Sequence, residues 1–162
     1  LEINPRDTNA YYNRGLAYKN KGQLDQAISD YTKALEIVPG VAEVYFSRGC
    51  VYHKQGQYDQ VISIYSKFLE IYPKDAWAYL AYIRRGHAYG IKGQYDHAIA
   101  DYTKALEINP GDALAYYNRG RAYYSKGEFN KSWDDIKKTQ DLGYKIPPEF
   151  LDDLRKASGR QN

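Results

Sequence analysis

The sequence is poor in the residues that build disulfides, metal clusters and membrane spans. Its single cysteine, Cys50, excludes an internal disulfide and a metal cluster built from thiolates alone. No apolar run approaches the ~18 residues that a membrane-spanning helix needs, and no signal-peptide pattern opens the chain. The sequence has no methionine, which indicates a segment of a longer protein. Its compartment is not identified by any motif, and the cytoplasm is the expected one.

Charge and motifs exclude further classes of protein. The net charge is +3 and the largest basic clusters are the pairs Arg84–Arg85 and Lys137–Lys138, so charge alone does not indicate a nucleic-acid binder. No glycine loop followed by Lys-Ser or Lys-Thr is present to hold a phosphate group. We therefore predict no enzymatic activity and no cofactor. Tyrosine, by contrast, is abundant, with 19 copies in 162 residues.

Two stretches of the sequence occur twice. The hexapeptide AYYNRG recurs after 105 residues and the octapeptide DYTKALEI after 71, and both spacings are a multiple of 34 plus three. Such a fixed period indicates a repeat architecture. The predicted repeats are 8–41, 42–75, 76–112 with three inserted residues at 76–78, and 113–146.

Each repeat is predicted to form two helices joined by a tight turn, because apolar positions recur at steps of three and four. Two columns of residues end these helices: Gly22, Gly56, Gly93 and Gly127 end the first, and Pro39, Pro73 and Pro110 end the second. A further glycine column lies inside the first helix, at Gly15, Gly49, Gly86 and Gly120. It predicts that the partner helix approaches closely there, with small alanine side chains opposite.

These columns of aromatic, glycine, tyrosine, alanine and proline residues at a 34-residue period resemble the tetratricopeptide repeat. The resemblance covers residues 8–146 and implies an all-α fold, an α-solenoid in which antiparallel helix hairpins form a right-handed superhelix. Residues 1–7 resemble the end of a preceding repeat. Residues 147–158 predict a capping helix with Phe150, Leu151, Leu154 and Ala157 on its buried stripe, and 159–162 a tail, within one domain over 1–162.

The insertion at 76–78 has no helix-breaking residue. It predicts about one extra turn at the start of the third repeat's first helix, with Asp75 as the N-cap. Trp77 then either projects at the rim or packs back onto its neighbours.

An arginine column raises a choice between structure and recognition: Arg14, Arg48, Arg85 and Arg119. Sixteen residues later stand Asp30, Asp101 and Asp135, with Ile64 interrupting the series. We predict a ladder of partly buried ion pairs across each hairpin, in which Arg48 shares Asp30 of the preceding repeat. The alternative is that free arginines recognise an anion.

Cys50, His53 and His87 are the only residues that suggest reactive or metal chemistry. A thiolate–imidazole pair or a metal site can be built from such groups. A metal needs a further ligand, however, and none stands at a suitable spacing, so we predict unrelated groove residues and no metal. His97 lies on a second helix and is predicted to be a surface residue.

By resemblance to the family, the remaining columns of the first helices line a concave groove that holds an extended or helical peptide. Tyr12, Phe46, Ile83 and Tyr117 form an apolar column suited to anchoring a partner, and Asn13, Arg84, Asn118 and Arg121 can hold a backbone or an acid. The lysine–asparagine carboxylate clamp of some family members is absent from the first repeat, where Tyr12 and Leu16 occupy its places. The predicted groove residues are Asn9, Tyr12, Asn13, Leu16, Lys19, Glu43, Phe46, Ser47, Cys50, His53, Leu80, Ile83, Arg84, His87, Leu114, Tyr117, Asn118, Arg121 and Tyr124.

The sequence therefore predicts a scaffold without enzymatic activity that binds a protein or peptide whose identity the sequence does not give. One alternative is homotypic assembly, because part of this surface can pack against a second copy and solenoid ends expose apolar surface. A second alternative is single-stranded RNA bound on stacking aromatic side chains. No partner in a membrane is predicted.

Overall fold

The computed structural model describes residues 6–160, so the part of the predicted preceding repeat at 1–5 lies outside the described residues. Within 6–160 the chain forms nine α-helices and no strand, which confirms the all-α fold of helix hairpins. The helices are α1 (Thr8–Asn20), α2 (Leu24–Ile37), α3 (Ala42–Lys54), α4 (Tyr58–Ile71), α5 (Ala78–Ile91), α6 (Tyr95–Ile108), α7 (Ala113–Ser125), α8 (Phe129–Asp141) and α9 (Pro148–Ser158).

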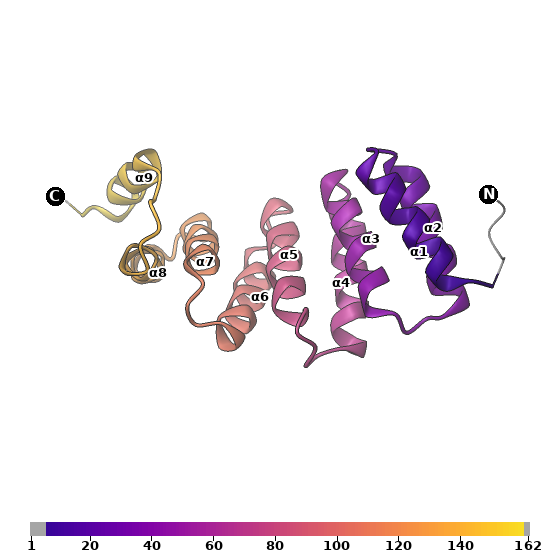
Figure 1. Ribbon diagram of the computed structural model, residues 1–162. Helices are drawn as coiled ribbons and strands as arrows, with labels where there is room; N and C mark the ends of the chain where they lie inside the picture. The colour runs from indigo at the N-terminus through magenta and orange to yellow at the C-terminus, as the bar shows by residue number, and fades with distance from the viewer. Residues whose placement is uncertain (1–5, 161–162) are drawn as a thin grey trace. The chain divides into compact units, whose positions relative to one another are not determined.

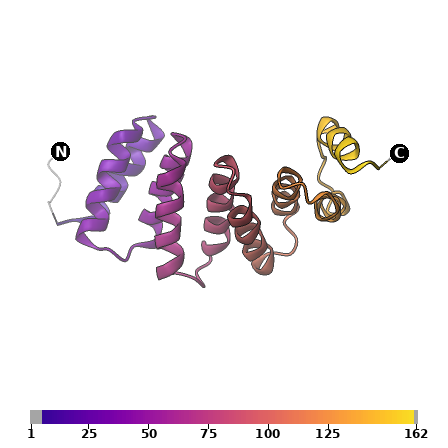
Figure 2. The ribbon, with the colours of Figure 1, turned by 180° about the vertical axis from the view of Figure 1, so that it is seen from behind.

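The helices belong to two compact units, which divide between Arg84 and Arg85 inside α5. In the N-terminal unit α1 packs against α2, α2 against α3 and α3 against α4, and Figures 1 and 2 show these helices side by side. In the C-terminal unit α6 packs against α7, α7 against α8 and α8 against α9. Each hairpin consists of two helices, and we call the one that comes first in the chain its first helix. The first helices are α1, α3, α5 and α7.

The helices end where the sequence predicts. Gly22, Gly56, Gly93 and Gly127 have φ angles of 76°, 71°, 72° and 80°, the left-handed conformation that ends a helix and favours glycine. Gly143 has a φ of 81° directly after α8 and its C-cap. The three prolines each stand two residues beyond the ends of α2, α4 and α6.

Three of the four glycines inside the first helices, Gly15, Gly49 and Gly86, make room for tyrosine rings and not for the predicted alanine column, whereas Gly120 lies against Asp135 and Ile136. A Cβ atom on Gly15 would lie 2.6 Å from Cε1 of Tyr31, and one on Gly49 would lie 2.6 Å from Cζ of Tyr65. Both rings are fully buried. A flat aromatic ring can therefore lie directly on the helix backbone only because these positions lack a Cβ atom.

We expect Gly49→Ala to lower the free energy of unfolding by about 1–2 kcal/mol. Overpacking a core position costs about 1–3 kcal/mol, and the better helix propensity of alanine offsets up to about 1 kcal/mol of it. Gly90→Ala is the matched control, because its nearest contact is Ala98 Cβ at 4.0 Å. In that control the free energy of unfolding should rise by up to about 1 kcal/mol. Urea unfolding measures both, and a stabilised Gly49→Ala variant would contradict the packing described here.

The prediction that the insertion lengthens a helix is wrong. Helix α5 begins at Ala78, and residues 73–77 form turns. The Asp75 side chain accepts a hydrogen bond from the Trp77 backbone N–H at 2.7 Å, and the Asp75 carbonyl accepts one from Ala78 N–H at 2.9 Å. Aspartate bonded to the backbone two residues on favours a turn over a helix. Two of the inserted residues, 76 and 77, therefore lengthen the link before α5, and the third, Ala78, begins the helix.

Residues 148–158 form helix α9, which packs against the last hairpin. Leu154 is fully buried in a cluster with Tyr117, Ile136 and Ile146, and Phe150 and Leu151 pack against that cluster. Ala157, predicted on the same stripe, is exposed instead. In this last turn Ser158 contacts α8, where its Oγ accepts a hydrogen bond from Trp133 Nε1 at 3.0 Å.

Candidate functional site

The predicted ladder of ion pairs is present and removes three arginines from the candidate binding groups. In each pair the arginine Nε and Nη2 donate to the two carboxylate oxygens of one aspartate at 2.7–2.8 Å. All three aspartates are buried. These arginines hold the two helices of a hairpin together, which overturns the alternative that they recognise an anion. The pairs are Arg14–Asp30, Arg85–Asp101 and Arg119–Asp135.

Tyrosine rings flank the arginines of the ladder. The Arg14 Cζ lies 5.5 Å from the ring centre of Tyr11 and 5.9 Å from that of Tyr18. Arg119 repeats the arrangement with Tyr116 and Tyr123, at 5.5 and 6.0 Å. The aromatic columns therefore contribute cation–π contacts to the ladder as well as apolar area.

Burial and pairing act in opposite directions on the charges of the ladder. Burial raises the pKa of the Asp101 carboxyl above its ordinary value, and the hydrogen bonds from Arg85 act against that rise. In the equivalent pair, the hydrogen bond to Asp135 raises the pKa of Arg119. The guanidinium groups are therefore charged, and each is stabilised in its partly buried position by the carboxylate beside it.

Arg48 does not pair with Asp30, contrary to the prediction. Its Nη1 donates to Thr32 Oγ1 at 3.1 Å, and its Nε is buried without a hydrogen-bond partner among residues 6–160. Both oxygens of Asp30 already accept bonds from Arg14, which explains the difference. Arg119 also donates to a threonine of the preceding hairpin, at 3.0 Å. Sequence reasoning missed this second acceptor, although both copies of DYTKALEI contain it.

Two of the four predicted apolar anchors are buried within their own units. Phe46 is 7% exposed, and its ring centre lies 4.5 Å from that of Trp77. Tyr117 is 9% exposed and packs against Tyr144 and Phe150. Little of either ring is accessible to a partner. Trp77 packs back onto Phe46 yet keeps 41% of its surface exposed, so both predicted alternatives hold in part.

The other predicted groove residues, apart from the buried Ser47, keep accessible surface. Tyr12 is half-buried, and its hydroxyl lies 3.4 Å from Ser47 Oγ. Leu80 and Leu114 are exposed apolar side chains. The remaining exposed or partly exposed members are Asn9, Asn13, Leu16, Lys19, Glu43, Cys50, His53, Ile83, Arg84, His87, Asn118, Arg121 and Tyr124. Their role in binding stays a prediction.

A cavity of about 490 Å³ lies in the N-terminal unit, and we call it the N-terminal cavity. Lysine and arginine side chains line it together with a thiol, an imidazole and small or neutral groups. Four of the predicted groove residues are among its walls. The lining residues are Lys19, Asn20, Cys50, Val51, His53, Lys54 and Arg84.

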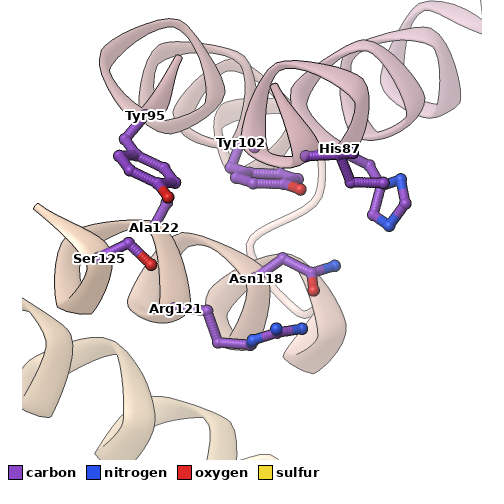
Figure 3. Close-up of a pocket in the computed structure, with 9 residues that line it drawn as sticks. His87, Tyr95, Tyr102, Asn118, Arg121, Ala122 and Ser125 are labelled. Carbon is purple, nitrogen blue, oxygen red and sulfur yellow. The ribbon is translucent and has the colours of Figure 1, made fainter. Parts of the chain in front are cut away.

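The C-terminal cavity measures about 260 Å³ and lies between α7 and the helix pair before it. Figure 3 shows Asn118, Arg121 and Ser125 on α7, facing His87, Tyr95 and Tyr102. Asn118, Arg121 and His87 are predicted groove residues. Burial raises the pKa of the Tyr102 phenol, so this hydroxyl stays neutral and can donate a hydrogen bond. Gly90, Ile91 and Ala122 complete the lining.

The residues that suggested metal or thiol chemistry do not form such a site within one unit. Cys50 Sγ lies 3.6 Å from the Tyr65 hydroxyl, and the His53 ring is edge-on to Tyr58. His87 belongs to the C-terminal unit. Among the described residues no group of three or more histidine, cysteine, aspartate or glutamate side chains is placed to hold a metal ion. His97 is exposed and stacks on Tyr89 at 4.9 Å, as its predicted surface position implies.

Between residues 6 and 160, every helix is too short or too polar to cross a membrane.

Family models of the tetratricopeptide repeat match residues 8–40 and 30–62, and a model described as a TPR repeat matches 86–127. The chain belongs to the tetratricopeptide-repeat family. This tetratricopeptide-repeat protein is therefore an interaction scaffold of a family whose members bind other proteins, and such scaffolds are typically not enzymes. A comparison with curated proteins gives no match.

Solved structures share the fold of this tetratricopeptide-repeat chain. MamA AMB-1 superposes with a TM-score of 0.79 at 22% identity, over 90% of this chain and 78% of that one. MamA from Desulfovibrio magneticus RS-1, residue 41 to its end, gives a TM-score of 0.77 at 23% identity, over 85% of this chain and 76% of that one. At these identities the likeness shows the fold alone.

Proposed function

We propose that this chain binds a segment of another protein on the surface of its first helices, within each unit. The observation that carries the proposal is the make-up of the two cavities. Seven of the nineteen groove residues that the family resemblance selected line them: Lys19, Cys50, His53, Arg84, His87, Asn118 and Arg121.

The accessible side chains divide into two kinds that suit peptide binding. Leu80 and Leu114 are large apolar residues with 38% and 46% of their surface exposed, and a partner can bury them. Asn118 and Arg121 line the C-terminal cavity and can bond to a peptide backbone or an acid. Apolar anchors surrounded by a few polar groups are what protein-binding surfaces typically contain.

Peptide selection followed by matched substitutions tests this proposal. Peptides selected from a displayed random library on the wild-type chain should bind Leu80→Asp and Leu114→Asp at least about threefold more weakly. Full burial of a leucine contributes about 1.5–3 kcal/mol, and a partner can bury the 38% and 46% of these side chains that is exposed. Ile108→Asp is the control, because Ile108 is 53% exposed at the end of a second helix. Equal losses in all three variants would contradict the assignment to the first helices.

Light scattering against concentration separates the proposal from self-assembly. A monomer at all concentrations removes the homotypic alternative. A dimer that Leu80→Asp or Leu114→Asp dissociates would make the partner a second copy of this chain. A dimer that survives those variants would place self-association on another surface and leave the peptide proposal standing.

A further inference from the structure

The N-terminal cavity gathers positive charge with no acid to balance it. Lys19 on α1, Lys54 on α3 and Arg84 on α5 line it, whereas no aspartate or glutamate does. Among residues 6–160, none of these three cations forms an ion pair. Cations that share one cavity repel one another, so an incoming anion is favoured there over a neutral or basic group.

Arg84 is the side chain best placed to receive that anion. Its Cζ lies 5.6 Å from the ring centre of Phe46, so an aromatic ring and not an acid holds the guanidinium. Its Nε is buried and has no hydrogen-bond partner in the described part of the chain. The ladder arginines show the contrast, because each gives both Nε and Nη2 to one carboxylate. Arg84 thus has a guanidinium donor that no protein acceptor satisfies, and a carboxylate is the acceptor that an arginine binds most strongly.

We propose that the N-terminal cavity binds a carboxylate side chain of an acidic peptide segment, with Arg84 as its main partner and Lys19 and Lys54 as supporting charges. The inference rests on the proposed function and adds the chemistry of the partner. A single-stranded nucleic acid is disfavoured, since it needs aromatic platforms for its bases and no phenylalanine, tyrosine or tryptophan lines the cavity.

The C-terminal cavity has one arginine in its lining where the N-terminal cavity has two lysines and an arginine. Arg121 lines it without an acid, and its Cζ lies 5.8 Å from the ring centre of Tyr117. Two tyrosines also line that cavity. It is therefore a second place where a carboxylate can bind, and it must be measured apart from the first.

Titration with a labelled octaglutamate peptide at low salt tests the inference, with octaglutamine as the uncharged counterpart. The protein carries Trp133→Phe, so that Trp77, which packs on Phe46 beside Arg84, is its single tryptophan. Octaglutamate should bind, shown by anisotropy, and should change Trp77 emission, whereas octaglutamine should not bind. Arg84→Gln should weaken octaglutamate at least about tenfold, the equivalent of one charged hydrogen bond.

Lys67→Gln removes the same charge from an exposed position on α4 outside both cavities and should leave the affinity within about twofold. Equal weakening by Lys67→Gln and Arg84→Gln, or no binding of octaglutamate, overturns the inference. So does tighter binding of an eight-nucleotide oligothymidylate than of octaglutamate. The library-selected peptides separate this inference from the proposed function. If they contain no acidic residues and bind Arg84→Gln as tightly as the wild type, but bind Leu80→Asp more weakly, the proposed function stands and this inference fails.

Discussion

Replacing Asp101 with alanine is expected to lower the free energy of unfolding by about 3 kcal/mol, since breaking a buried pair leaves a charge without its partner. Asp101 is 5% exposed, and its oxygens accept bonds from Arg85 at 2.7 and 2.8 Å. The Arg85 side chain, 18% exposed, has too little contact with water to replace the lost carboxylate.

Two further variants make this expectation specific to the ladder. Glu107→Ala removes an exposed pair with Lys104, whose side chains are 57% and 56% exposed, and should change the stability by no more than about 1 kcal/mol. Arg85→Leu with Asp101→Leu removes both charges and should recover most of the loss, because well-packed apolar groups can replace a buried ion pair. Urea unfolding measures all three. Equal effects of Asp101→Ala and Glu107→Ala would contradict a structural role for the ladder.

The features that sequence predicted well are those fixed by the repeat itself. A spacing of sixteen residues places Arg14 and Asp30 opposite each other in any antiparallel hairpin of this length, and three such pairs are present. The helix ends follow from local conformational preferences of glycine and proline. Each of these inferences needs only one hairpin and no knowledge of its neighbours.

The features that the sequence did not predict depend on contacts between neighbouring repeats. Arg48 turns to Thr32 because Arg14 already occupies Asp30, which no single spacing reveals. Phe46 is buried beneath Trp77, a residue of the insertion that has no equivalent in the other repeats. In the predicted apolar column of anchors, Phe46 is therefore buried by local packing and offers a partner little surface. The charged lining of the N-terminal cavity also required the structure, because three helices contribute to it.

Leu154→Ala should have the second large effect on stability, a loss of about 3 kcal/mol. Removing a fully buried leucine forfeits its transfer free energy and leaves a cavity, which together cost about 2–5 kcal/mol. Leu154 is the only fully buried residue of α9, so the loss falls on the docking of this helix. Undocking would expose Ile136, which is otherwise fully buried in the cluster beneath α9.

Trp133 reports whether α9 has left its place. In a Trp77→Phe background Trp133 is the single tryptophan, and its Nε1 donates to Ser158 of α9 at 3.0 Å. Leu154→Ala should shift its emission to the red at lower urea than in the parent and should speed hydrogen exchange across α9 first. Lys156→Ala, an exposed change on the same helix, should stay within about 0.5 kcal/mol of the parent. If exchange across α9 instead kept the parent's rate, Leu154 would not be what holds this helix against the last hairpin.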